Sequence, residues 1–332
     1  MDPMATDALT LVGINILLWL ISLPLGKTWP VDLIWSNWPV YQAVAIYVRS
    51  RGGGACGTAD RQVLTLSLVC VWGFRLTSNF CSRGGIGGED WRYADMRRKL
   101  GGHFWWVSLF AVFLGQTAFL FLPCLSLYGA LGELPGAGAP LGTADWAGGA
   151  VSLAGIALEA AADGQMDAFL ASAALAAAAA GGGGGRGRRE GEREGGAEEP
   201  PAAAVMSAGL WAYSRHPNYL GEIMFWWGLY LLSLSDTEPW RACGPAALTL
   251  LFALVSVGLM EERQLARRGL AYREYRRRVG SPLLLLPRAI NRRLGGMMYG
   301  SRSAEAGGLE EGGGQGAAPR LAGTIGGAAA DK

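Results

Sequence analysis

The sequence predicts an all-α integral membrane protein, built as a polytopic transmembrane helical bundle of about seven spans. Of its 332 residues, 51% are hydrophobic, 13 are tryptophan, and long apolar runs recur along most of the chain. This composition is typical of proteins for which lipid is the main solvent. The formal net charge of +2 lacks the basic excess of a nucleic-acid-binding protein, so membrane lipids and not nucleic acids are the expected partners.

Seven apolar runs approach the roughly 20 residues that a helix needs to cross a bilayer. They lie near 9–26, 36–48, 62–80, 104–131, 145–165, 218–235 and 240–260. The second run is short and contains Pro39, and the fifth is rich in small residues, so six to eight spans fit the pattern and seven is the best count. Residues 1–8 carry Asp2 and Asp7 and no basic residue, unlike a cleavable signal peptide, so the first run is expected to remain as a helix.

Basic residues in short loops predict the orientation. They gather in the segment 81–103 and after Met260, whereas the loops 132–144 and 235–240 are acidic. The N-terminus is therefore expected on the lumenal or outer side and the C-terminus in the cytosol, in the endoplasmic reticulum or another internal membrane if the source is eukaryotic. Arg49, Arg51 and Arg61 lie on the predicted lumenal side and do not fit this rule.

Two segments lack the large apolar residues that a packed core requires. Residues 171–204 run from alanines through glycines to mixed Arg and Glu, and residues 300–332 are rich in Gly and Ala. The chain thus divides into N-terminal membrane helices (1–170, about five spans), a disordered low-complexity insertion (171–204), a C-terminal membrane segment (205–299) and a disordered tail (300–332). The alanines that open the insertion could extend the fifth helix.

The five cysteines and two histidines are scattered, without ligand spacing. Neither a disulfide framework nor a zinc site is indicated. We expect no metal.

Polar side chains are densest between Ser214 and Glu222. Pro217 suits the first position of a helix, which places Arg215 and His216 beside the positive end of the helix dipole, where a phosphate or carboxylate can bind. The alternative is that both side chains merely reach the membrane interface.

The helix that follows is expected to turn one polar face inward. Asn218, Glu222 and Trp226 recur at four-residue steps, so they share that face. An acid such as Glu222 is costly near the bilayer unless it meets a partner or a water-filled cavity. It could simply pair with an arginine and lock two helices, but the clustering of polar types in eight residues favours a functional site.

The fifth helix carries a second set of polar residues. Glu159, Asp163 and Asp167 share one face, and Gln165 lies nearby. Three acids on one stripe repel each other unless a cation or hydrogen-bond donor lies opposite. Arginines of the segment 81–103 are the candidates, and the alternative is a solvated face that leads into the insertion.

A third set follows the third run. Arg75 lies about one turn from the end of an apolar helix, where it can reach into a cavity. Asp90, Arg92 and Tyr93 come shortly after. The glycines between these two groups lack the βαβ context of a dinucleotide-binding motif, so a flexible turn is expected.

These motifs resemble the steroid 5-alpha-reductase-like membrane proteins, in particular the bacterial and protist branch of unknown function called DUF1295. The strongest element is Gly209-Leu-Trp followed by Tyr213-Ser-Arg-His-Pro-Asn-Tyr-Leu-Gly-Glu222. Trp72-Gly with Arg75-Leu-Thr, Glu89-Asp with Arg92-Tyr93, Gln116, and Glu159 with Asp163 and Gln165 support it. The similarity extends from about Asp32 to Pro287, interrupted by the insertion.

The resemblance implies a seven-helix fold that holds NADPH in a cytosol-facing cavity, from which hydride passes to a carbon–carbon double bond of a hydrophobic, lipid- or steroid-like substrate. It implies cofactor contacts by the residues at Asp163, Asn218, Tyr219 and Glu222. Further contributors to the cofactor site are expected among Arg75, Asp90, Arg92, Tyr93, Gln165, Arg215 and His216. No catalytic residue is assigned.

The chain also departs from the steroid-specific enzymes. Their tyrosine three residues before the matching arginine polarises the substrate ketone, whereas this chain has Trp72, and an indole cannot act as that acid. Met166 replaces a basic residue, and the insertion precedes Gly209. The substrate is therefore left open.

Two other functions stay open. A SAM-dependent isoprenylcysteine-type carboxyl methyltransferase also shows Arg-His-Pro, then Glu-Glu and Tyr-x-x-Tyr, which Glu261-Glu262 and Tyr272-x-x-Tyr275 would match. Asn218 and Glu222 do not fit that family. The other is a non-catalytic lipid-binding membrane protein that keeps an old cavity, which the absence of the ketone-facing tyrosine favours.

Overall fold

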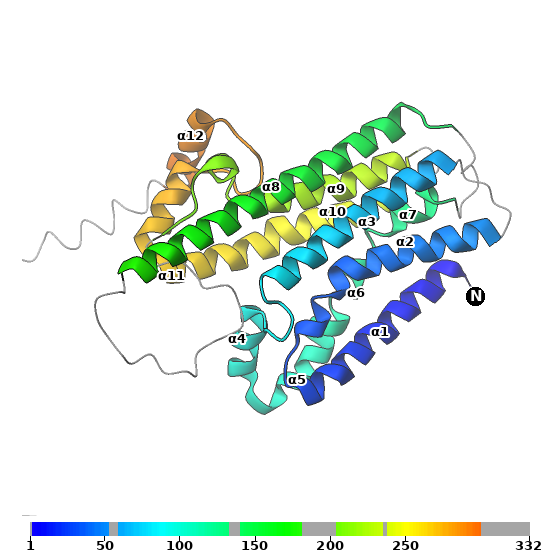
Figure 1. Cartoon of the computed structure of the whole chain (residues 1–332), viewed down its shortest axis with the longest axis horizontal. Coiled ribbons are helices and arrows are strands. Elements are labelled where there is room, and N and C mark those ends of the chain that lie inside the picture. The colour runs from blue at the N-terminus through cyan, green and yellow to red at the C-terminus, as the bar shows by residue number, and fades with distance from the viewer. Residues whose placement is uncertain (1, 53–58, 133–139, 181–203, 235–237, 300–332) are drawn as a thin grey trace, which may run out of the picture.

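The computed structural model describes every residue except 1, 53–58, 133–139, 181–203, 235–237 and 300–332, and the described residues form helices joined by turns (Figure 1). Within this part of the chain no strand is present. Four helical segments are long and apolar enough to cross a membrane: Pro3–Leu25, Asp60–Ser82, Trp91–Ala130 and Pro239–Arg278. The chain is therefore an integral, multi-pass, all-α membrane protein.

All seven predicted runs fall in helical segments. The N-terminal half contains α1 (Pro3–Leu25), α2 (Ile34–Gly52), α3 (Ala59–Ser82), α4 (Trp91–Leu100), α5 (Phe104–Ser108), α6 (Thr117–Phe121) and α7 (Leu125–Ala130). The C-terminal half contains α8 (Thr143–Ala180), α9 (Pro217–Leu232), α10 (Cys243–Leu250), α11 (Val257–Arg278) and α12 (Arg288–Tyr299). A π-helical turn joins α5 to α6, and another joins α10 to α11.

Three of the seven runs, in α2, α8 and α9, are helical without being among the four candidate spans. Pro39 lies inside α2 and does not end it. The alanines at 171–180 continue α8. The rest of the expected insertion, apart from its last residue, lies outside the described residues, and so does the expected tail.

Ion pairs show that α3 and α8 run parallel. Arg61 at the start of α3 pairs with Asp145 at the start of α8 (2.8 Å), and Arg83 just beyond α3 pairs with Asp167 further along α8 (2.8 Å). The partners in both pairs are 84 positions apart in the sequence. Two straight helices of equal rise keep such a constant offset only when they lie parallel and in register.

Buried pairs also account for two of the arginines that did not fit the charge rule. The Arg49 guanidinium pairs with Asp7 of α1 (2.7 Å), and Arg61 pairs with Asp145 in a fully buried contact. The Asp7 carboxylate also accepts a hydrogen bond from the Tyr128 hydroxyl (2.5 Å). These arginines thus hold helix ends together and are not free loop charges.

The most extensive helix packing among the described residues lies between α8 and α9. A Cβ atom placed on Gly155 of α8 would lie 2.5 Å from the Gly221 carbonyl oxygen of α9, and one on Gly221 would lie 2.7 Å from the Glu159 Cβ atom. Gly148 of α8 and Gly228 of α9 make similarly close approaches. Small residues let membrane helices approach closely. Packing then holds the helices together, because the hydrophobic effect does not drive helix association within lipid.

We expect Gly155→Ala to lower the stability of the protein by about 1–3 kcal/mol, because the added methyl group overpacks a backbone contact. Gly164→Ala is the matched control, since it lies in the same helix and nothing lies within 4 Å of its added Cβ atom. That change should be neutral or stabilising by about 0.5–1 kcal/mol. Thermal unfolding in detergent, followed by size-exclusion chromatography, measures both. Equal effects of the two variants would contradict the proposed packing role.

Candidate functional site

Polar side chains of α3 and of the turn after it face acidic side chains of α8 along two helical turns. We call this set the α3–α8 ladder, and its members are Arg75, Asn79, Arg83, Glu159, Asp163 and Asp167. Each side of the ladder advances in steps of four residues, which keeps its members on one helix face. The expectation of arginines opposite the acidic stripe is confirmed, with one from α3 itself and one from the segment 81–103.

Arg75 lies at the inner end of the ladder. Its guanidinium contacts Glu159 (2.6 Å) and Asp163 (3.0 Å), while the Asn79 amide donates a second hydrogen bond to Asp163 (3.0 Å). Glu159 and Asp163 are buried, whereas the Asp167 side chain is 46% exposed. With three acids against two arginines, the ladder carries one excess negative charge when all its groups are ionised.

Glu222 of α9 lies beside this inner end, because Gly221 packs against Glu159. Its carboxylate accepts hydrogen bonds from two indoles, Trp72 Nε1 and Trp226 Nε1, each at 2.8 Å. Trp72 is fully buried and stacks on Phe225, with ring centroids 4.8 Å apart. The tryptophan at the position of the expected tyrosine therefore orients an acid.

Two cavities lie along α3. The inner cavity, of about 30 Å³, has apolar walls that include Trp35 and Leu248, with Glu222 as the one charged residue among the described residues that line it. The outer cavity, of about 300 Å³, is lined by Asp32, Asn79 and Arg83 together with apolar residues. Leu76 lines both. An outer space with charged groups in its wall thus shares a lining residue with an apolar inner space.

Tyr219 lies at the start of α9 between two rings. It stacks on His216 (centroids 5.1 Å apart) and on Phe252 (4.8 Å). The charged groups of Arg92, Asp90 and Asp163 lie near it. Tyr219 thus lies between the ladder and the start of α4.

Asn218, its neighbour, has a buried side-chain oxygen with no hydrogen-bond partner among the described residues. A buried acceptor without a partner is costly. This oxygen is a candidate contact for a ligand.

The start of α4 forms the outer wall of the region. Asp90 caps α4 through the Arg92 backbone N–H (2.8 Å), and its side chain also binds the Arg92 guanidinium (2.7 Å). The Tyr93 hydroxyl donates to Asp32 (3.2 Å). Burial and the neighbouring Asp90 raise the pKa of Asp32 to about 7. A carboxyl group that lines the outer cavity can therefore take up a proton near neutral pH.

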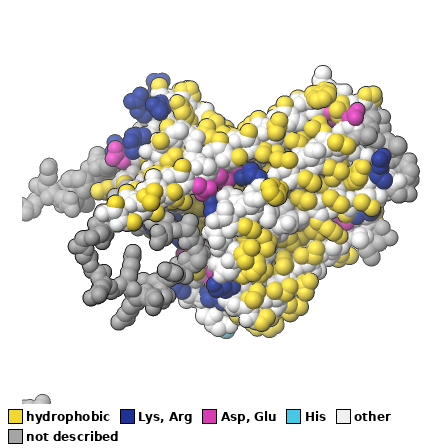
Figure 2. Space-filling view, in the orientation of Figure 1, with side chains coloured by type: hydrophobic (Ala, Val, Ile, Leu, Met, Phe, Trp, Pro, Cys, Tyr) yellow, Lys and Arg dark blue, Asp and Glu magenta, His cyan; other side chains and the backbone are white. Residues whose placement is uncertain are grey.

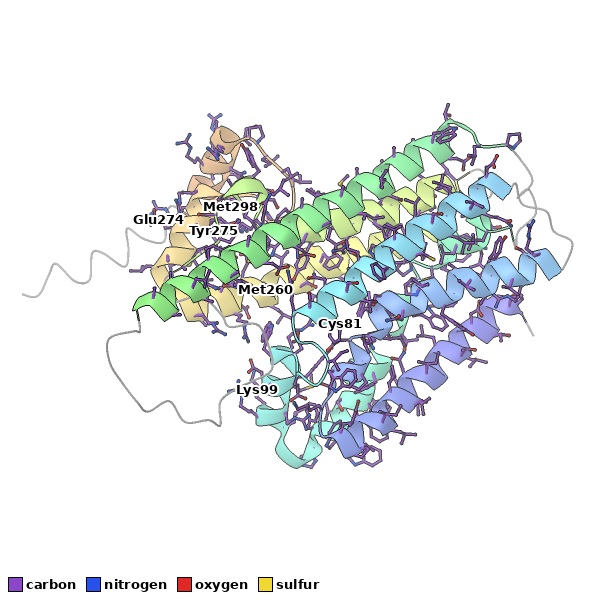
Figure 3. The ribbon with its side chains drawn as sticks, viewed as in Figure 1. Cys81, Lys99, Met260, Glu274, Tyr275 and Met298 are labelled. Atoms are coloured by element: carbon purple, nitrogen blue, oxygen red, sulfur yellow. The ribbon has the colours of Figure 1, made fainter. Side chains whose placement is uncertain are left out.

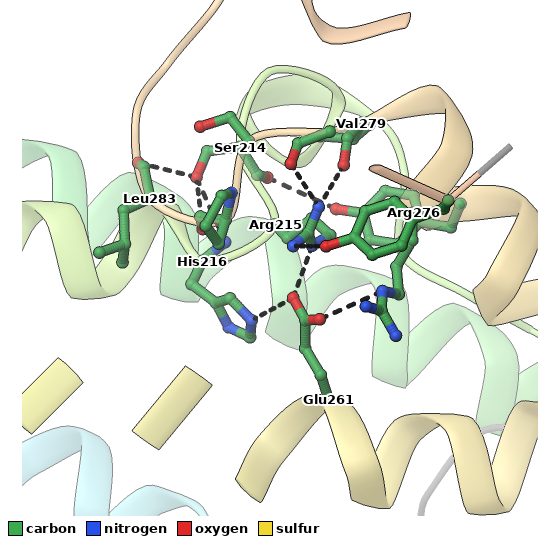
Figure 4. A network of polar contacts seen from close by, with 12 residues as sticks. Ser214, Arg215, His216, Glu261, Arg276, Val279 and Leu283 are labelled. Carbon is green, nitrogen blue, oxygen red and sulfur yellow. Dashed lines mark hydrogen bonds and ion pairs between the residues drawn. The ribbon is translucent and has the colours of Figure 1, made fainter. Parts of the chain in front are cut away.

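Arg215 and His216 belong to a separate network (Figure 4). The Arg215 guanidinium donates to Glu261 (2.6 Å), to the carbonyl oxygens of Val279 and Gly280 (2.7 Å each) and to the Tyr299 hydroxyl (3.1 Å). His216 Nε2 lies 3.6 Å from Glu261. Burial lowers the His216 pKa, which keeps the imidazole neutral. Pro217 opens α9 as expected, but the arginine beside it is occupied by protein groups and serves to hold the chain after α11.

The side chain of Gln165 also binds another part of the protein. Its side-chain oxygen accepts a hydrogen bond from the Leu210 backbone N–H (2.9 Å). It lies against Gly209, whose φ of +56° is strained for other residues. Gln165 thus fixes the segment before α9 to α8.

The structure therefore brings together most of the predicted site residues around the ladder, the start of α4 and α9: Arg75, Asp90, Arg92, Tyr93, Asp163, Asn218, Tyr219 and Glu222. Gln165, Arg215 and His216 lie in supporting contacts instead. The sequence prediction did not name Asp32, Trp72, Asn79 and Trp226 as cofactor contacts, although it placed Trp226 on the face of Glu222. Asn79 lies four residues after Arg75, a spacing that could have indicated it in the same way.

Comparison with known proteins identifies the family of this chain but assigns no activity to it. The family described as protein of unknown function (DUF1295) matches residues 18–279. An uncharacterized protein of Schizosaccharomyces pombe is 23% identical over 245 residues, which cover 71% of this chain and 66% of that relative, just under two thirds of its length. No solved structure matches the chain.

We expect Asp163→Asn to destabilise the protein by about 1–3 kcal/mol, because a neutral amide oxygen replaces the buried carboxylate that accepts hydrogen bonds from Arg75 and Asn79. Asp167→Asn is the control on the same stripe. Its half-exposed ion pair should contribute about 0–1 kcal/mol. Melting temperatures of the two variants in one detergent test the ladder. A loss of stability in Asp167→Asn as large as that in Asp163→Asn would contradict the buried position of Asp163 in the ladder.

Proposed function

We propose that this chain, which belongs to the DUF1295 family of proteins of unknown function, is a membrane-embedded NADPH-dependent reductase. It would act on a carbon–carbon double bond of a hydrophobic, lipid-like substrate. The observation that carries the proposal is the position of Glu222. Two indoles orient this acid at the wall of an apolar cavity, beside the buried end of a charged ladder. Such a junction suits a polar ligand that meets an apolar one.

The motif resemblance to steroid 5-alpha-reductase-like proteins supports the same reading. The residues that would hold NADPH are Asp163, Asn218, Tyr219 and Glu222, with Arg75, Asp90, Arg92 and Tyr93 nearby. The unpartnered oxygen of Asn218 and the outer cavity of about 300 Å³ beside Arg83 fit a polar ligand with an anionic part. When bound, this cofactor supplies a hydride.

The side chains of the site would bind and orient the cofactor and the substrate, and they would exclude water. Glu222 can accept hydrogen bonds from an amide group, since its position is fixed by the indoles of Trp72 and Trp226. The apolar wall excludes water from the hydrophobic substrate and strengthens electrostatic interactions there. The Trp72 indole N–H donates a hydrogen bond but is far too weak an acid to release its proton, so it does not replace a tyrosine as acid.

One observation favours a second function, the SAM-dependent carboxyl methyltransferase. The excess negative charge of the ladder would attract the positive sulfonium of S-adenosylmethionine. The Glu-Glu and Tyr-x-x-Tyr motifs give it less support, because Glu261 binds Arg215 and the Tyr275 hydroxyl donates to the Trp211 carbonyl oxygen (2.7 Å). A non-catalytic lipid-binding protein is the third candidate.

Thermal unfolding with added NADPH or S-adenosylmethionine separates the three functions, because only a ligand of the folded state stabilises it. We expect NADPH to raise the melting temperature and S-adenosylmethionine to leave it unchanged. The opposite result would select the methyltransferase. Stabilisation by neither cofactor would favour the lipid-binding protein.

The same proposal predicts that Glu222→Gln weakens NADPH binding more than Glu262→Gln. A hydrogen bond that a partly buried carboxylate accepts from the cofactor contributes about 1.5–3 kcal/mol, roughly ten- to a hundredfold in affinity. Glu262 is exposed at the start of the basic part of α11, so its loss should matter little. Fluorescence titration of NADPH, after both variants are shown to be folded, measures the difference. Equal losses would weigh against Glu222 as a cofactor ligand.

We also propose the seven-span arrangement with the C-terminus in the cytosol. The parallel pairing of α3 with α8 supports it, since these would be the third and fifth spans. The end of the bundle at which α3 and α8 finish also carries α4 and the basic part of α11 (Figure 1). Basic residues at one end favour the cytosolic side.

Cysteine labelling in sealed microsomes tests this orientation. Cys81 near the end of α3 (Figure 3) and Cys243 at the start of α10 are both exposed. In single-cysteine variants we expect a membrane-impermeant maleimide to label Cys81 directly and Cys243 only after permeabilisation. Labelling of both detergent-treated proteins is the control. Direct labelling of Cys243 but not of Cys81 would show that the orientation is opposite to the one proposed.

A further inference from the structure

The helix α12 presents an apolar and basic surface that the proposed reaction does not use. Its outward side chains include Ile290 (52% exposed) and Met297 (77% exposed), and Leu284 just before the helix is 59% exposed. Arg292 and Arg293 are also exposed and make no ion pair or hydrogen bond with any described residue. We call this set the α12 surface. Figure 2 shows basic side chains gathered at this corner of the molecule beside hydrophobic ones.

Helix periodicity puts two apolar side chains and one arginine on one face. Ile290, Arg293 and Met297 follow each other at three- and four-residue steps, so they form one stripe. Arg292 lies about 100° around the helix from Arg293, on the flank of this stripe. The opposite face is buried through Asn291, whose amide donates to the Tyr213 carbonyl oxygen (2.8 Å), and through Gly295. This stripe therefore faces away from the rest of the protein, and the contacts of the opposite face fix the position of α12.

Under the seven-span arrangement proposed above, that position is level with the membrane edge. The chain before α12 is bonded to the residues that precede α9, through the His216 N–H to the Pro282 carbonyl (2.9 Å) and the Leu286 N–H to the Tyr213 carbonyl (3.1 Å). α9 has 16 residues, about 24 Å at 1.5 Å per residue, so as the sixth span it would cross most of the hydrocarbon thickness of about 30 Å. The residues just before Pro217, and α12 with them, would then lie near the interface.

We propose that the α12 surface binds anionic phospholipid headgroups of the membrane in which the protein is embedded. An amphipathic helix with arginines beside an apolar stripe lies in the interface, with its apolar side chains below the headgroups and its charges among them. Arg292 and Arg293 match the phosphate and carboxylate groups of such lipids. The contact also reaches the core of the protein, because Tyr299 at the end of α12 accepts a hydrogen bond from Arg215.

The test measures binding of dihexanoyl phosphatidylserine, below its micelle concentration, to the whole protein in a neutral detergent by calorimetry. Dihexanoyl phosphatidylcholine and inorganic phosphate are the comparison ligands. We expect the wild-type protein to prefer the serine lipid over both. Each basic side chain near an anionic surface strengthens binding about fivefold, so Arg292→Gln with Arg293→Gln should weaken binding about 30-fold.

The exposed basic pair Arg98 and Lys99 of α4 provides the matched control (Lys99 is labelled in Figure 3). Changing both to Gln removes the same charge elsewhere and should leave binding unchanged. Met297→Gln should weaken binding of the lipid, and phosphate alone should not bind. Equal losses in the control pair, equal binding of the choline lipid, or phosphate binding as tight as lipid binding would each overturn the proposal.

A second measurement keeps the test informative if the double variant folds poorly. Wild-type protein extracted with its surrounding lipids in polymer discs should retain more anionic phospholipid than the Met297→Gln variant does. Light scattering of the same samples reports the oligomeric state. A change from oligomer to monomer in that variant would show that the α12 surface is instead a contact between copies of this chain.

Discussion

The close contact between the glycine faces of α8 and α9 determines where the polar groups of this protein meet. Because Gly155 and Gly221 carry no side chains, Glu159 and Glu222 come to lie at the same level of two adjacent helices. Glu159 is then bound by Arg75, and Glu222 by the indole of Trp72, both from α3. A wider separation of α8 and α9 would leave two acids in the membrane without these partners, which is costly in hydrocarbon.

The ion pairs between α3 and α8 fix the register of these two helices. A constant offset of 84 positions links Arg61 to Asp145, Asn79 to Asp163 and Arg83 to Asp167. A shift of one turn would leave at least one of these charges buried and unpaired, and an unpaired buried charge costs more than the pair contributes. The pairs therefore specify one arrangement of the helices more than they stabilise it.

The supporting network around Arg215 joins three parts of the chain that are remote in sequence. Its guanidinium binds α11 through Glu261, the segment after α11 through Val279, and α12 through Tyr299. Arg276 adds a second contact to Glu261 (3.2 Å) and lies over the Tyr299 ring. In this way the start of α9, which bears Tyr219 and Glu222, is anchored to α11 and α12.

The sequence alone determined the membrane class, the helical nature of all seven apolar runs and most of the residues that gather at the site. Apolar run length follows from bilayer thickness, and four-residue spacing follows from helix geometry, so both can be read without a structure. The opposing arginines of the acidic stripe were expected on the same grounds, since like charges on one stripe require a counter-charge.

Only the tertiary structure decided which partner each polar group takes. Arg215 and His216 look like an anion site from their place at a helix start, yet Glu261 and two carbonyl oxygens occupy the arginine. Trp72 looked like a lost acid, and the fold shows that it orients Glu222. These outcomes depend on contacts between residues 46 and 150 positions apart. Local sequence carries no information about such contacts, because they arise from how helices pack and not from how each helix forms.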